Sequence, residues 1–142
     1  MPVQHINPPE MHANPAFTQA ILLPAGARTL LIGGQNAVDT NGQIVGKGDL
    51  GAQTAKALEN LQFCLKAAGA TLEQLVQVKI YLAGDVDIRP GFGAWMAVWG
   101  TRPNPPTVTG LRVHGLANPD FLVEIEAMAV IDQGVMSSSF GK

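Results

Sequence analysis

The sequence predicts a mixed α+β domain in which two helices pack on one face of a β-sheet. Apolar residues recur at three- and four-residue steps between Asp49 and Gly69, and a second stripe of this kind follows Pro90, so two helices are expected. Apolar and β-branched segments before, between and after these helices predict the strands. Because no internal repeat divides the 142 residues, we expect one domain over 1–142, with the proline-rich residues 1–15 as an extended N-terminal arm.

The first two strands are expected to form a hairpin. Residues 17–23 and 29–32 are rich in apolar and β-branched side chains, and Pro24-Ala25-Gly26 between them has the chemistry of a turn. Gly33-Gly34 then interrupts the second strand. Such a pair indicates either a β-bulge or a close approach of another group to the backbone, and only the close approach would serve a function.

Helix boundaries in the middle of the chain carry local signals. Asp49 is a good N-cap for the first helix, and residues 71–74, Thr-Leu-Glu-Gln, have the spacing of a capping box before a strand over 76–83. Pro90 can begin the second helix and Gly100 can end it. The apolar face of this second helix consists of Phe92, Trp95, Met96 and Trp99.

The last two expected strands indicate that the protein associates with further subunits. Two strands are expected over 107–113 and 121–131, and in the second the odd-numbered residues are all apolar and should face the helices. The even-numbered positions are Leu122, Glu124, Glu126, Met128 and Val130. With both helices on the first face, the apolar members of this second face would be exposed unless another subunit covers them. Glu124 and Glu126 would then lie in or beside a subunit interface.

Charge composition argues against several classes of protein. Charged residues make up 14% of the chain, where roughly 25% is usual, and this deficit also favours oligomerisation. The formal net charge of −2 gives no basic surface for nucleic acid, and no stretch of about eighteen apolar residues is present to span a membrane. The N-terminal residues have neither the basic nor the apolar region of a signal peptide, so we expect a cytoplasmic protein without nucleic-acid or membrane partners.

No motif predicts a metal or a cofactor. Cys64 is the only cysteine, and the histidines at positions 5, 12 and 114 form no HExxH pair. The glycine-rich motifs of nucleotide binding are also missing. Arg112 and His114 share one face of a strand and could bind an anion, although a solvated strand end is the simpler explanation.

Glu124 and Glu126 are the chemical candidates. They are two residues apart on a strand and therefore share a face, where they could supply the acid and base groups that hydrolysis uses. The alternative is that both are partly solvated or ion-paired. Burial of a carboxylate in so apolar a strand would require a partner or a purpose.

Six segments together resemble one family. The match runs from about residue 14 to residue 131, and it rests on Phe17-Thr-Gln-Ala20, Ile32-Gly-Gly-Gln35, Leu65-Lys-Ala-Ala-Gly69, Val78-Lys-Ile-Tyr-Leu82, Arg102-Pro103 and Val123-Glu-Ile-Glu-Ala-Met-Ala129. On these residues the chain resembles the RidA family, also called YjgF or L-PSP endoribonuclease-like. The resemblance implies a chorismate-mutase-like α+β fold and a homotrimer with ligand clefts between neighbouring subunits.

The resemblance also implies a reaction. Active members hydrolyse enamines and imines to 2-oxo acids and ammonia without metal or cofactor. Water must be aimed at the C=N carbon and a proton given to nitrogen, and the first glutamate of the family's EIEA motif, which takes this role, corresponds to Glu124. An arginine holds the substrate carboxylate in the family. Its position is Pro105 in this chain, and the possible substitutes are Arg102, Arg112 and Lys79.

The expected substrate-binding residues follow from the same resemblance. Phe17 keeps the aromatic ring of the family's YSQ motif without its hydroxyl, Gly33 replaces a serine, and Phe92 replaces an asparagine. Each change makes the expected cleft less polar. The full set is Phe17, Gly33, Gly34, Gln35, Phe92, Trp95, Pro105, Thr107 and Arg112.

Three functions stay open at this point. The first is hydrolytic deamination of an enamine or imine metabolite, with Glu124 directing water. The second is a small-molecule binding or sensing module without turnover, which the replacement of the family arginine by Pro105 favours. The third is the ribonuclease activity in the family's older name, and the acidic net charge and the lack of a catalytic histidine pair argue against it.

Overall fold

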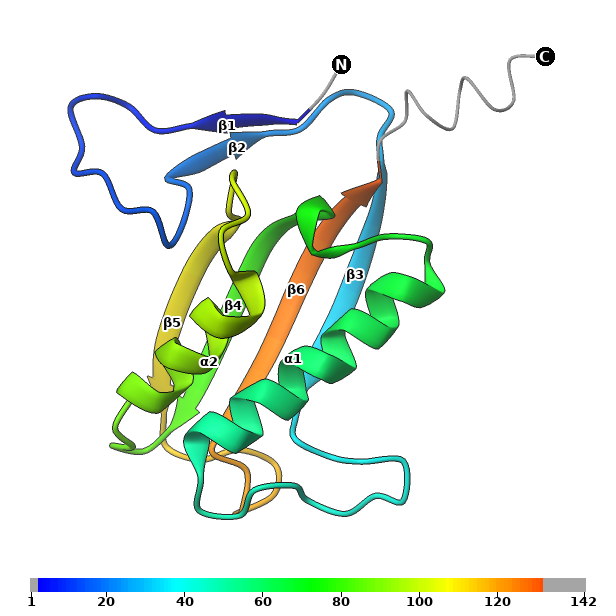
Figure 1. Ribbon diagram of the computed structural model, residues 1–142, viewed down its shortest axis with the longest axis vertical. Helices are drawn as coiled ribbons and strands as arrows, with labels where there is room; N and C mark the ends of the chain where they lie inside the picture. The colour runs from blue at the N-terminus through cyan, green and yellow to red at the C-terminus, as the bar shows by residue number, and fades with distance from the viewer. Residues whose placement is uncertain (1–2, 132–142) are drawn as a thin grey trace.

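Residues 3–131, which the computed structural model describes, form a main sheet of four strands in the order β3-β6-β4-β5 (Figure 1). The strands are β3 (Arg28–Gln35), β6 (Val123–Ile131), β4 (Leu75–Ala83) and β5 (Thr107–Val113). β6 runs antiparallel to both of its neighbours, whereas β4 and β5 are parallel. Residues 1–2 and 132–142 of the single domain expected from the sequence lie outside the described part.

Two helices cover one face of this sheet, as predicted (Figure 1). The carboxylate of Asp49 caps α1 (Leu50–Ala67) by accepting the backbone N–H of Ala52 at 3.0 Å. A capping box opens the short 3-10 turn η1 (Leu72–Gln74), which leads into β4. Gly100, with φ of +66°, ends α2 (Arg89–Trp99). Within residues 3–131, no helix has the length and apolar character needed to cross a bilayer.

The predicted hairpin of residues 17–23 with 29–32 is wrong. Residues 20–22 do form a strand, β2 (Ala20–Leu22), but it pairs with β1 (Gln4–Ile6) from the N-terminal arm, and β3 pairs with β6 instead. The two-stranded β1-β2 sheet lies at one end of the main sheet (Figure 1). β3 gains more by pairing with β6, because β6 is a long apolar strand in the interior of the sheet and β2 is a three-residue segment.

The core lies between the helices and the sheet. Val123, Ile125, Ala127 and Ala129 of β6 are all buried there, which confirms the alternation predicted for this strand. They pack in one cluster with the apolar stripe of α1, which includes Leu58, Leu61 and Leu65.

The opposite side of the sheet, here called the open face, is covered by no helix or strand among residues 3–131. It carries Leu31, Lys79, Tyr81, Glu124, Glu126 and Met128. Leu31 is 73% exposed and stands directly across from Met128 in the register of β3 with β6. The sequence predicted that Leu122, Met128 and Val130 would be exposed here, and this is wrong for two of them, because Val130 is 3% exposed and Leu122 packs against the core cluster. The pair of Leu31 and Met128 still favours a subunit interface on this face.

Candidate functional site

The Gly33-Gly34 pair marks both a bulge and a close approach. The register of β3 with β6 shifts between Ile32 and Gln35, so the two glycines form a β-bulge. At Gly34 the carboxyl group of Glu124 occupies the space that a side chain would need, because a Cβ there would lie 2.1 Å from Oε2 of Glu124. A Cβ on Gly33 would meet nothing within 4 Å. Gly34 is therefore the position that admits the carboxylate.

One asparagine that the sequence analysis missed, Asn36, holds this carboxylate, and a second, Asn60, holds the backbone that carries Asn36. The Asn36 side-chain amide donates to Glu124 Oε1 at 3.2 Å and to the backbone oxygen of Val123 at 3.1 Å. From α1, the Asn60 amide donates to the backbone oxygens of Asn36 and Val38, both at 3.0 Å. Glu124 is half-buried, so these contacts fix the position of a carboxylate that still reaches the open face.

The neighbouring carboxylate, Glu126, has a different partner. The hydroxyl of Tyr81 donates to Oε1 of Glu126 across the β4-β6 pair. This hydrogen bond, together with burial and the negative charges of Glu126 and Glu124, raises the pKa of the Tyr81 hydroxyl above its usual value. The two glutamates thus share the open face but differ in role, because Glu126 is committed to Tyr81 whereas Glu124 faces the glycine bulge.

Of the three cations considered as substitutes for the family arginine, only Lys79 lies on the open face. Lys79 stands opposite Glu126 in the register of β4 with β6, and it makes no ion pair with any residue of 3–131. Arg102 is paired with Glu73 at 3.3 Å and donates to two carbonyls of α2. Arg112 donates to the backbone oxygens of Gly84 and Val86.

Arg112 is also on the wrong side of the sheet to meet Glu124 within one chain. It pairs with Leu82, which in turn pairs with the buried Val123, so all three residues share the helix side. The guanidinium bridges the end of β4 to the loop before α2. Hydrogen bonds from Arg89 lower the pKa of the neighbouring Asp87 carboxyl to about 2, and the charge of Arg112 adds a smaller effect in the same direction. Arg112 therefore stabilises the loop between β4 and α2.

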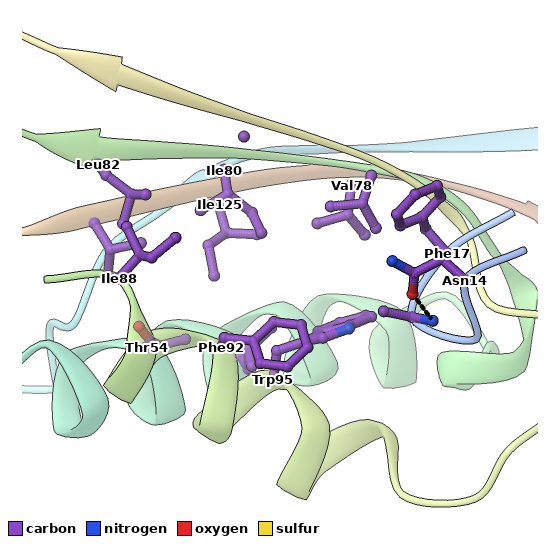
Figure 2. A pocket seen from close by; sticks show the side chains of 16 residues that line it. Asn14, Phe17, Thr54, Val78, Ile80, Leu82, Ile88, Phe92, Trp95 and Ile125 are labelled. Carbon is purple, nitrogen blue, oxygen red and sulfur yellow. Dashed lines mark hydrogen bonds between the residues drawn. The ribbon is translucent and has the colours of Figure 1, made fainter. Parts of the chain in front are cut away.

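Three of the expected substrate-binding aromatics line a separate pocket. The pocket lies between α2 and the helix side of β4 and β5, with Phe92 and Trp95 on its α2 side and Phe17 at one end beside Asn14 (Figure 2). Val123 and Ile125 of β6 also line it. Those two core residues alternate with Glu124 along β6, so the pocket and the carboxylate lie on opposite faces of the sheet. The structure therefore divides the expected site into an open-face part, with Gly33, Gly34 and Glu124, and an apolar part within the helix layer. Gln35, which was expected beside Glu124, stands opposite Ile125 in the register of β3 with β6 and so belongs to the helix side.

Pro105 and Thr107 lie where the N-terminal arm meets the sheet. The hydroxyl of Thr18 donates to the Pro105 carbonyl and contacts Nδ1 of His5 at 3.1 Å. Burial lowers the pKa of the His5 imidazole below its usual 6.5. Thr107 begins β5, and its hydroxyl donates to the Val76 carbonyl at 3.0 Å. Through Thr18, the loop that contains Pro105 is linked to His5 of the N-terminal arm, whereas the Thr107 contact joins β5 to β4.

The part of the chain that the structure describes contains no cluster of potential metal ligands. No three residues of the types His, Cys, Asp and Glu come together there as a metal site would require. The chemistry available on the open face is that of an oriented carboxylate, a tyrosine hydroxyl and a lysine.

Two helices packed on one face of a mixed sheet form the α+β fold that the family resemblance implies. The family model of endoribonuclease L-PSP matches residues 9–131. The chain belongs to this family, which is also known as RidA or YjgF.

Relatives and solved structures agree with this assignment. A RutC family protein of Pyrococcus horikoshii is 34% identical, with 80% of this chain and 85% of that protein covered. The 2-iminobutanoate/2-iminopropanoate deaminase of Rattus norvegicus is 33% identical, with 81% and 80% covered. A crystal structure of a Rid family protein of unknown function from Yersinia pestis superposes with a TM-score of 0.82 at 34% identity, covering 92% of this chain and all of that one.

Proposed function

We propose that this protein is a cytoplasmic homotrimer that hydrolyses an enamine or imine metabolite in clefts between its subunits, with Glu124 as the catalytic residue. The observation that carries the proposal is the seating of the Glu124 carboxylate over Gly34, where Asn36 holds one of its oxygens. Among residues 3–131 the other carboxylate of the open face is Glu126, which accepts the Tyr81 hydroxyl and does not lie against the glycine bulge. The name of the rat relative supports the reaction class.

The reaction needs little from the protein. Glu124 accepts a proton from water as the water oxygen bonds to the C=N carbon, and it returns the proton to nitrogen. Glu124 then takes the hydroxyl proton of the tetrahedral intermediate and passes it to the amino group, so that the C–N bond breaks, ammonia leaves and the carbon–oxygen bond becomes a carbonyl. A carboxylate fixed by Asn36 is suited to this shuttle because its position does not have to be acquired during the reaction.

Lys79 is proposed as the cation for a substrate carboxylate. It shares the open face with Glu124, and no carboxylate within residues 3–131 neutralises it. A lysine binds a carboxylate as a point charge and lacks the bidentate geometry of arginine, so we expect weak binding of ordinary 2-imino acids. Replacing Lys79 by glutamine is expected to raise KM for 2-imino acids roughly tenfold, because the loss of one hydrogen bond to a charged group costs about 1.5 kcal/mol of binding free energy. A wild-type KM in Lys79→Gln would exclude this role.

The experiment for the proposed reaction is semicarbazide-competed hydrolysis of a panel of 2-imino acids, which an amino-acid oxidase generates in the assay. The wild-type protein should lower the yield of semicarbazone by hydrolysing the imine first. Glu124→Gln should remove about 100-fold or more of this rate, the range of one general acid–base group. Glu126→Gln is the matched control, since it changes the other open-face carboxylate, and it should keep most of the rate.

A binding or sensing module is the second candidate, and the Pro105 position supports it. The family's arginine is missing there, and Arg102 and Arg112 are both held by other groups. For this function, wild type and Glu124→Gln would give the same semicarbazone yield on every imine. Saturable binding of a 2-oxo acid to the wild type in calorimetry, weakened in Lys79→Gln, would then identify the open face as the binding site.

A further inference from the structure

A second site lies on the other side of the sheet. Sixteen residues line a pocket of about 240 Å³ between α2, α1 and the helix side of β4 and β5 (Figure 2). None of these residues is charged. An apolar cavity of roughly 150 Å³ already binds benzene in a well-studied protein, so this pocket is large enough for a small ring compound. Phe92 and Ile88, which are 56% and 45% exposed, stand at its rim on or next to α2.

At the exposed edge strand β5, a glycine leaves one wall of the pocket without a side chain. Gly110 pairs with Ile80 in the middle of β5 and lines the pocket. A Cβ on Gly110 would meet nothing within 4 Å. Glycine weakens a strand interior and leaves the core without a side chain, and in a strand it often marks a place where a ligand approaches the backbone.

One polar group in the pocket has no partner. The Thr54 hydroxyl of α1 is buried, with Thr54 only 4% exposed, and within residues 3–131 nothing accepts from it or donates to it. Thr54 lines the pocket from the helix side (Figure 2). A buried hydroxyl without a hydrogen bond costs stability, and this cost is removed when a ligand supplies the missing partner.

We propose that this pocket binds a neutral, mainly apolar small molecule of the size of one ring, with a single hydroxyl or carbonyl that hydrogen-bonds Thr54 Oγ1. The absence of charged residues excludes a carboxylate or an amine as the main recognition element. All of the lining residues belong to one chain, and they face away from Glu124. Within one chain the pocket therefore lies on the opposite side of the sheet from Glu124.

Cyclohexanol is a suitable probe, because it has the expected size and one hydroxyl and does not absorb at tryptophan wavelengths. Trp95 lines the pocket and stacks on Trp99 with ring centroids 5.6 Å apart, and these are the two tryptophans of the chain. Titration with cyclohexanol should therefore give a saturable change in tryptophan fluorescence. Cyclohexane, which lacks the hydroxyl, is the comparison ligand.

Two variants locate the binding. Gly110→Leu fills the pocket and should weaken cyclohexanol binding more than tenfold, whereas Gly93→Leu, on an exposed position of α2 outside the pocket, should leave it unchanged. Thr54→Val keeps the shape but removes the hydroxyl, so cyclohexanol should bind about three- to tenfold more weakly while cyclohexane binds as before. Glu124→Gln should bind cyclohexanol like the wild type, which separates this site from the imine reaction.

Several outcomes would overturn the proposal. The absence of a saturable fluorescence change with the wild type would do so, and so would an affinity in Gly110→Leu equal to that of the wild type. Circular dichroism establishes whether Gly110→Leu is folded. If it is not, the comparison of the two ligands on Thr54→Val decides, because equal losses for cyclohexanol and cyclohexane would contradict a hydrogen bond at Thr54.

Discussion

Gly34→Ala is expected to lower the rate of imine hydrolysis about 100-fold while leaving the fold intact. The new Cβ would lie 2.1 Å from Oε2 and 2.6 Å from Cδ of Glu124, so the glutamate side chain must leave its seat. The side chain can rotate away at little cost in stability, but the carboxylate then loses Asn36 and its position. A misplacement of this size costs about 100-fold in rate. The measurement is kcat/KM for imine hydrolysis, together with the urea midpoint.

The adjacent glycine provides the control for this substitution. Gly33→Ala introduces the same methyl group one residue away, where it would meet nothing within 4 Å. It should retain kcat/KM within about threefold and unfold at the urea concentration of the wild type. Wild-type activity in Gly34→Ala would mean that the seating of Glu124 has no part in the reaction, and equal losses in both variants would point to the bulge backbone instead.

The second large effect is expected at Leu31. This side chain is 73% exposed on the open face, next to Met128, and the proposed trimer covers it. Leu31→Arg would place an unpaired charge in that interface at a cost of several kcal/mol, enough to dissociate the assembly. Sedimentation should then give 14.9 kDa, the mass of one chain, with an unchanged circular dichroism spectrum. Imine hydrolysis should be lost with the trimer.

Phe63 offers the matching control for this charge. It is 57% exposed on α1, within the helix layer and away from the open face. Phe63→Arg should leave both the mass and the hydrolysis rate unchanged. Dissociation by Phe63→Arg but not by Leu31→Arg would place the subunit interface on the helix layer.

Local chemistry explains which elements could be predicted from the sequence. Asp49, the Thr71 capping box and Gly100 each act within one turn of backbone, and the structure has all three boundaries within one or two residues of the predicted ones. The alternation along β6 is equally local. Strand pairing, in contrast, is not a local property. The hairpin prediction failed because the choice of β6 over β2 as the partner of β3 depends on residues about a hundred positions away.

The residues of the candidate site likewise divide into those that a local sequence signal indicates and those whose position depends on distant parts of the chain. Glu124 could be predicted from its place in an apolar strand, and the approach to Gly34 from the glycine pair. Asn36 and Asn60 were missed, although Asn36 directly follows the Gly-Gly-Gln segment and that position was the available signal. The separation of Arg112 from Glu124 depends on the register among three strands, which no single segment of sequence specifies.

The measurement that most directly tests the account is light scattering on the eluting wild-type protein, with imine hydrolysis assayed on the same fractions. The proposed trimer should elute as one peak at three times the 14.9 kDa of one chain, with all of the hydrolytic activity in that peak. A monomer of 14.9 kDa that carries the full activity would contradict it, because the open face would then be solvent-exposed and the cleft that Glu124 is proposed to serve would not exist.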